Sequence, residues 1–180
     1  DRDNRKMAFA KRRDTSLTEE KDGFSPDASA MRRAISAARE GIQEGESPFG
    51  ACIVLDGDPI SVAHNQVWGS IDITQHAEIV AISEACRRLG SPHLTGAVLY
   101  STCEPCPMCF SACHWADLQR VVCGAEIADA AHLGFRELTI SNRTMKRLGG
   151  SDVEITAGFL RDECLVLFDE WLKRPDRKVY

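Results

Sequence analysis

The sequence predicts a three-layer α/β/α sandwich, in which helices cover a central β-sheet. Segments with the apolar spacing of amphipathic helices alternate with short apolar runs of strand length, and neither a repeat nor a linker interrupts them. The chain has 180 residues, 43% apolar and 27% charged, which is the size and composition of one soluble domain. We therefore expect a single domain over residues 26–180, after a polar extension at residues 1–25 that is partly disordered.

The first half of the chain contains two predicted helices, residues 27–44 and 75–90, which end near Gly45 and Gly90. Their apolar positions recur every three or four residues: Met31, Ile35, Ala38 and Ile42 in the first helix, and Ile79, Ile82, Cys86 and Leu89 in the second. Between them, residues 49–64 predict two strands joined by the turn DGDP.

The second half alternates shorter elements. Strands are predicted at residues 97–102, 120–125 and 153–158, and helices at 107–116, 128–135 and 159–173. Pro107 favours a helix start at that position, because its missing N–H would have no helical partner there. The region from residue 136 to 150 has no clear periodicity, and we interpret it as a loop.

Charge and composition limit the classes of partner. The formal net charge is −5 and the isoelectric point is about 5.6, whereas a nucleic-acid-binding domain is usually basic on at least one face. No apolar run approaches the roughly 18–20 residues of a membrane span, and no signal peptide is visible. We therefore predict a cytoplasmic protein with a small-molecule partner, and neither nucleic acid nor membrane as partner.

Half of the eight cysteines lie in the stretch STCEPCPMCFSACHWA, at the spacing C-x-x-C-x-x-C-x-x-x-C. That spacing is typical of ferredoxin iron–sulfur sites, but such a site expects proline after its fourth cysteine, where this chain has histidine. A structural Cys₄ zinc site needs four converging thiols, and Cys103 falls in the preceding strand. Because Cys106 and Cys109 share the first helical turn, we interpret Cys103 and Cys113 as core thiols, with the iron–sulfur cluster as a minor alternative.

A second motif favours a catalytic zinc site over these alternatives. The tripeptide HAE begins the helix before the cysteine run, and with PCPMC it forms the H-x-E…P-C-x-x-C pattern of zinc deaminases. Three ligands, His76, Cys106 and Cys109, leave the fourth zinc position to water, whose pKa the metal lowers to about 7. Glu78 is then placed to act as the base that moves the proton of this water.

These motifs resemble the cytidine-deaminase-like superfamily, and within it the guanine deaminase branch. The similar segments are SPFGACIV, HNQV, ITQHAEIVAI, LYSTCEPCPMC and GFRE, and the resemblance covers about residues 27–150. It implies a five-stranded mixed sheet between helices, one Zn²⁺ ion per subunit and, commonly, a homodimer. The segments GESPFGA and DITQHAE depart from GGPFGA and DPTAHAE, which are frequent in the branch.

The resemblance also assigns substrate contacts. Asn65, eleven residues before the zinc histidine, corresponds to the asparagine that binds the purine, and Glu137 to the acidic residue that meets the guanine edge. A carboxylate complements the N1–H and 2-amino donors of guanine, whereas adenine has no N1–H. We expect Phe49 and Trp115 to sandwich the base, with His114 near its edge.

Tyr180 corresponds to an aromatic tail that closes the pocket in this family, sometimes over a neighbouring subunit, and a disordered terminus is the alternative. The predicted function is zinc-dependent hydrolysis of guanine at C2 to xanthine and ammonia, with Glu78 as proton shuttle. The alternatives are a deaminase of guanosine, cytosine or an aminotriazine such as ammeline, a tRNA adenosine deaminase, and a metal-binding module without activity.

Overall fold

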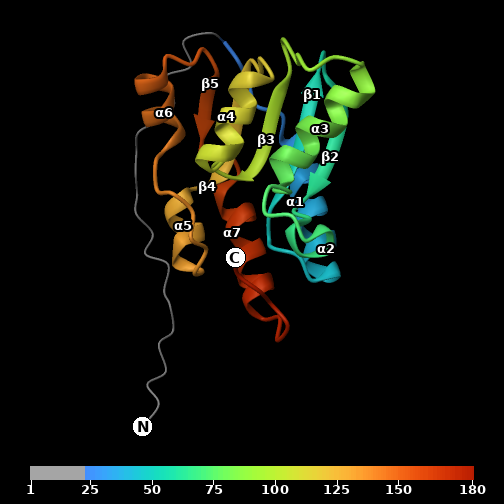
Figure 1. The fold of residues 1–180 in the computed structure, drawn as a ribbon, viewed down its shortest axis with the longest axis vertical. Coiled ribbons are helices and arrows are strands. Elements are labelled where there is room, and N and C mark those ends of the chain that lie inside the picture. Colours follow the sequence, from blue (N-terminus) through green and yellow to red (C-terminus); the bar gives the residue numbers. More distant parts are fainter. Residues whose placement is uncertain (1–22) are drawn as a thin grey trace.

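The structure is a computed structural model that describes residues 23–180. At its centre lies a five-stranded sheet in the order β2-β1-β3-β4-β5 (Figure 1). The strands are β1 (Gly50–Leu55), β2 (Asp58–His64), β3 (Val98–Cys103), β4 (Arg120–Ala125) and β5 (Glu154–Ala157). β1 pairs antiparallel with β2 and β3, and β4 pairs in parallel with β3 and β5, so the predicted mixed sheet is confirmed.

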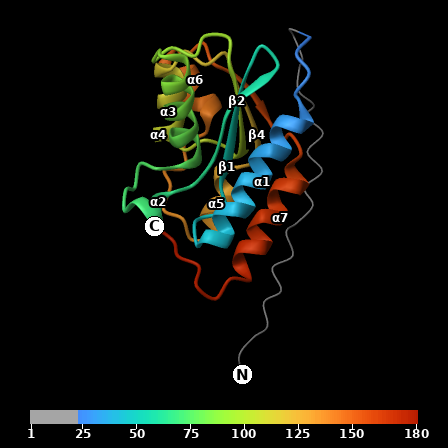
Figure 2. The ribbon, with the colours of Figure 1, turned by 90° about the vertical axis from the view of Figure 1, so that its right-hand side faces the viewer.

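Helices cover both faces of this sheet. They are α1 (Ala28–Glu44), α2 (Val67–Ser70), α3 (Ala77–Leu89), α4 (Pro107–Trp115), α5 (Ile127–His132), α6 (Asn142–Gly149) and α7 (Arg161–Leu172). α1 and α7 lie side by side on one face, and α3 and α4 lie on the other (Figure 2). The predicted three-layer sandwich is therefore confirmed.

Helix α1 shows how the sequence sets the packing of the layers. The carboxylate of Asp27 accepts a hydrogen bond from the N–H of Ser29 and caps the helix, and Gly45 ends it with φ 89°. A side chain at Gly50 would collide with the backbone carbonyl of Ala34. Glycine at the start of β1 therefore allows α1 to lie directly on the sheet.

One edge of the sheet collects several of the candidate site residues. β1 runs antiparallel to both of its neighbours, so the start of β1 lies beside the ends of β2 and β3. Phe49 precedes β1, Asn65 follows β2, and Cys106 follows β3 after two intervening residues. Ligands of open α/β sheets bind beyond the carboxyl ends of strands, so this edge is the expected position of a site.

The structure contains two helices that the sequence did not predict. One is α2, a single turn, and the other is α6, in the region interpreted as a loop. Ser141 caps α6 by accepting a hydrogen bond from the N–H of Thr144. α5 begins before the predicted helix start, at Ile127, because Glu126 and Asp129 form a capping box there.

The predicted polar extension, residues 1–25, lies largely outside the described residues, which begin at residue 23. Phe24 is described: it packs against the core, and the guanidinium carbon of Arg120 lies 4.2 Å from the centre of its ring. Among the helices that the structure describes, none combines the length and apolar character needed to cross a bilayer.

Candidate metal centre and active site

Two helix N-termini position the three candidate ligands. His76 immediately precedes α3, Cys106 immediately precedes α4, and Pro107 is the first residue of α4. Cys109 lies three residues after Cys106, so both sulfur atoms can lie on the same side of the helix. The free N–H groups at a helix N-terminus favour negative charge, which suits thiolate ligands.

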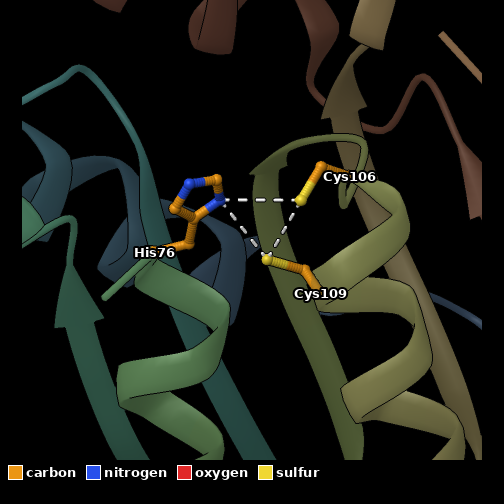
Figure 3. Close-up of side chains that lie close together, drawn as sticks. All are labelled: His76, Cys106 and Cys109. Carbon is orange, nitrogen blue, oxygen red and sulfur yellow. Dashed lines mark hydrogen bonds between the residues drawn. The ribbon is translucent and has the colours of Figure 1, made fainter. Parts of the chain in front are cut away.

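The three ligand atoms lie close together (Figure 3). The Nδ1 atom of His76 is 3.6 Å from the sulfur of Cys106 and 3.5 Å from that of Cys109, and the two sulfurs are 3.6 Å apart. Donors held about 2.0–2.3 Å from one tetrahedral zinc are roughly 3.5–3.8 Å from one another. The separations therefore fit one zinc ion between these three residues.

Electrostatic interactions within the cluster favour the thiolate form of Cys106. A hydrogen bond with Cys109 and contact with His76 outweigh burial and lower the pKa of Cys106 to about 4. Burial raises the pKa of Cys109, and its hydrogen bond to Cys106 raises it further. Burial alone would lower the pKa of His76, but the hydrogen bond with Cys106 and the charge of Glu78 raise it overall. The donor set of one imidazole and two thiols is one that zinc prefers.

Glu78 points into the same cluster from the first turn of α3. One carboxylate oxygen accepts a hydrogen bond from the hydroxyl of Ser101 at 3.0 Å, and the other lies 3.5 Å from the sulfur of Cys109. Burial raises the pKa of Glu78, and the nearby His76 opposes the rise. A buried carboxylate with a raised pKa is suited to accept and return a proton.

A small cavity of about 10 Å³ lies beside the cluster. The residues that line it are Phe49, His76, Glu78, Cys103, Glu104, Cys106 and Glu137. Burial raises the pKa of Glu137 to about 7, and the negative charges of Cys106 and Glu78 contribute to the rise. Glu137 therefore faces the same enclosed space as the candidate base, although no helix or strand contains it.

Tyr180, at the end of the C-terminal tail, lies beside the ligand cluster. Its hydroxyl accepts a hydrogen bond from the side-chain amide of the fully buried Asn65 at 2.8 Å. Its ring centre lies 5.4 Å from that of His76, 5.2 Å from that of Phe135 and 6.4 Å from that of Trp68. The tail thus lies over the candidate site of its own chain.

Comparisons with known proteins agree with this geometry. A family model described as the cytidine and deoxycytidylate deaminase zinc-binding region matches residues 25–125. The chain belongs to this deaminase family. It is 40% identical over 154 residues to the guanine deaminase of Bacillus subtilis (strain 168), covering 83% of this chain and 96% of that protein. It is also 37% identical over 134 residues to the tRNA-specific adenosine deaminase of the same organism, covering 74% of this chain and 81% of that protein.

A solved guanine deaminase from Nitrosomonas europaea has a similar fold, with a TM-score of 0.74 and 28% sequence identity over 82% of this chain and 85% of that one. The resemblance to the guanine deaminase branch is therefore confirmed. The protein is a zinc-dependent aminohydrolase, and its zinc cofactor is shown by the family together with the cluster of His76, Cys106 and Cys109.

The deaminase structure does not bring Trp115 and His114 to this site within one chain. Trp115 is the last residue of α4, whereas Cys106 precedes the first, and a nine-residue helix is about 13 Å long. The side chain of Trp115 is 78% exposed, and Nδ1 of His114 lies 3.1 Å from the hydroxyl of Ser151. Both residues lie away from the cluster within one copy of the chain, and their contact with the base stays a prediction. Phe49, the other expected ring, does line the cavity.

Several residues of the deaminase site were not predicted. Phe135 packs its ring 5.1 Å from Phe49, and Glu104 accepts hydrogen bonds from backbone N–H groups of Ile127 and Asn142. Phe135 and Glu104 stood inside the motifs GFRE and CEPC, so the sequence carried a signal for them. Ser101, whose hydroxyl contacts Glu78, lies in a strand, and its sequence position gave no such indication.

Proposed function

We propose that this deaminase hydrolyses guanine at C2 to give xanthine and ammonia. The observation that carries the proposal is that Glu137 and Glu78 line one enclosed cavity together with His76 and Cys106. A second carboxylate beside the reaction centre complements the N1–H and 2-amino donors of guanine. The 40% identity to a guanine deaminase along 83% of the chain supports the same substrate.

In the proposed reaction, His76, Cys106 and Cys109 hold the zinc, which supplies Lewis-acid activation of a water molecule. Glu78 takes a proton from the water as its oxygen adds to C2, and gives a proton to the adjacent ring nitrogen. Glu78 then takes the proton of the hydroxyl group now on C2 and transfers it to the 2-amino group, which leaves as ammonia as its bond to C2 breaks and the C2 carbonyl forms. The hydroxyl of Ser101, bonded to Glu78, supports the orientation of this carboxylate.

Recognition of the ring is assigned to residues around the cavity. Glu137 accepts from the donors of the guanine edge, Asn65 donates to a ring acceptor, and Phe49 provides an apolar wall. Tyr180 closes the site against water from the same chain, a role that its contacts with Asn65 and His76 support. The rings of Phe135 and Phe168 pack against Phe49 in edge-type contacts, and this packing supports the proposal that Phe49 is a rigid wall of the site.

A tRNA adenosine deaminase is the second candidate, because such an enzyme is 37% identical over 74% of this chain. The net charge of −5 and the tail that covers the site argue against a folded nucleic acid as substrate. Glu137 also argues against adenine, since adenine offers no N1–H to a carboxylate.

The test is an ammonia-release assay on zinc-loaded protein with guanine, guanosine, cytosine, adenine, ammeline and a tRNA anticodon stem-loop. We expect the highest kcat/KM with guanine. A higher kcat/KM with any of the other substrates would refute guanine as the preferred substrate. If the substrate with the highest kcat/KM were the stem-loop, the protein would be a tRNA adenosine deaminase.

We further propose that the protein is a cytoplasmic homodimer and that residues 26–180 form its single domain. None of the eight cysteines, all within the described residues, forms a disulfide, which is consistent with a reducing compartment. The exposed ring of Trp115 and the exposed Leu148 supply apolar surface for a second copy. Light scattering after size exclusion would give twice the chain mass of 19.9 kDa for a dimer and the chain mass itself for a monomer.

A further inference from the structure

Asn142, the first residue of α6, is a fully buried polar residue that the proposed reaction does not use. Its side-chain nitrogen donates a hydrogen bond to the backbone carbonyl of Pro105 at 2.6 Å. Its side-chain oxygen has no hydrogen-bond partner among the described residues, and a buried acceptor without a partner costs free energy. The side chain thus forms one bond and leaves one acceptor unpaired, so its net contribution to the stability of the fold is small.

The contacts of Asn142 lie immediately before a zinc ligand. The carbonyl of the buried Pro105 can only accept a hydrogen bond, so the nitrogen of the Asn142 amide, and not its oxygen, must face it. The backbone N–H of Asn142 donates to a carboxylate oxygen of Glu104 at 2.8 Å. One residue of α6 therefore bonds to the two consecutive residues that precede Cys106.

The hydrogen bond to the carbonyl of Pro105 acts on Cys106 through the peptide unit that joins the two residues. That carbonyl and the nitrogen of Cys106 lie in one rigid plane, so the direction of the carbonyl fixes the backbone where Cys106 begins. On one side of this unit, the N–H of Glu104 donates to the carbonyl of Ala125 in β4 at 2.8 Å. On the other side, the carbonyl of Cys106 accepts from the N–H of Phe110 in α4 at 2.8 Å. Because proline has no N–H, its carbonyl is the backbone group through which the intervening residue can be held.

We propose that Asn142 is a positioning residue of the zinc site, which orients Cys106 through the carbonyl of Pro105. The sulfur of Cys106 lies 3.6 Å from Nδ1 of His76 and 3.6 Å from the sulfur of Cys109. Distances between zinc and its donors vary by only about 0.2 Å, so a rotation of the Cys106 backbone would weaken the site. The inference depends on the zinc site and not on which heterocycle is deaminated.

The test is the zinc affinity of the full chain after Asn142→Leu, which keeps a side chain of similar size and removes the donor to Pro105. We expect the Kd for Zn²⁺, measured by competition with a chelator, to rise about 10- to 100-fold. The visible absorption of the Co²⁺-substituted protein, which reports the geometry of the thiolate ligands, should change as well. A purely structural role would lower the stability of metal-free and zinc-loaded protein alike and leave the Kd for Zn²⁺ unchanged.

Ser141→Ala is the matched control, because it perturbs the start of the same helix. The hydroxyl of Ser141 accepts a hydrogen bond from the N–H of Thr144 at 3.2 Å and caps α6. Loss of this cap should lower the melting temperature, while the Kd for Zn²⁺ should stay within about twofold of the wild-type value.

Two outcomes would overturn the proposal: an unchanged Kd for Zn²⁺ in a folded Asn142 variant, or an equal rise of the Kd in Ser141→Ala. Should leucine prevent folding, as checked by circular dichroism, Asn142→Ala removes the same amide without needing new space and is measured in its place. Failure of the wild-type protein to deaminate guanine would refute the proposed substrate and leave this inference standing, since zinc binding needs no turnover.

Discussion

Glu137→Gln should stabilise the metal-free protein at about pH 8 and leave its stability nearly unchanged near pH 4.5. The folded state raises the pKa of Glu137 from 4.5 to about 7, chiefly through burial and then through the charges of Cys106 and Glu78. A difference of that size corresponds to about 3 kcal/mol, which is an upper value for one substitution. Glutamine removes the charge while keeping nearly the same shape.

The sign follows from proton linkage. Below pH 4.5 the carboxyl of Glu137 is protonated in both folded and unfolded protein, so its charge costs nothing. As the pH rises toward 7, the unfolded chain ionises first, and the stability of the folded wild-type protein falls. Above pH 7 both states are ionised and the full cost is present. The gain from Glu137→Gln should therefore grow between pH 4.5 and 7 and then remain constant.

The measurement is urea unfolding of chelator-treated protein at about pH 5 and about pH 8, with the free energy of unfolding extrapolated to water. Glu40→Gln, on the exposed side of α1, is the control and should change little at either pH. An equal effect of Glu137→Gln at both pH values, or a loss of stability at pH 8, would refute the reasoning.

Three further predictions concern the holoenzyme. Glu78→Gln should keep its zinc but lose about 10²- to 10⁴-fold in kcat, because it removes the proton carrier; near-wild-type turnover would contradict that role. Cys109→Ala should lose zinc, measured by atomic absorption, whereas Cys103→Ala should retain it; zinc loss in both variants would mean that Cys103 is a ligand. Tyr180→Phe should lower KM a few-fold, since it frees the amide of Asn65 for substrate, and a higher KM would show that the phenol itself binds the ring.

The order of elements could be predicted because each long element has a sequence pattern of its own. The predicted face of α1, with Met31, Ile35, Ala38 and Ile42, is buried. In α3 the buried face was predicted in part: Ile82 is buried, but Leu89 is 41% exposed, while Ala81 and Ala85 are fully buried. Small alanine side chains allow α3 to pack closely on β1 and β2, and a search for large apolar residues overlooks that face.

The metal site could be predicted because its ligands lie in two short motifs, each at the start of a helix. His76 and Cys106 lie thirty residues apart in the sequence, yet the HAE and PCxxC motifs sufficed to pair them. Trp115 was expected to stack on the base, but within one chain it lies at the other end of α4 from Cys106. Trp68 could not be found at all, because its contact with Tyr180 depends on where the C-terminal tail returns to the sheet edge.

The position of Tyr180 has a consequence for affinity. The tail is held by the bond from Asn65, by ring contacts with Phe135 and Trp68, and by the ammonium of Lys178, 5.2 Å from the centre of the Trp68 ring. In the proposed reaction, a substrate that bonds to Asn65 must replace the phenol there, so its apparent affinity is multiplied by the fraction of protein in which Asn65 is free of the phenol. The same closure over bound substrate would exclude bulk water from the carboxylate that moves the protons. The tail contacts therefore favour turnover only while they are weak enough for a bound substrate, with its own polar contacts, to replace them.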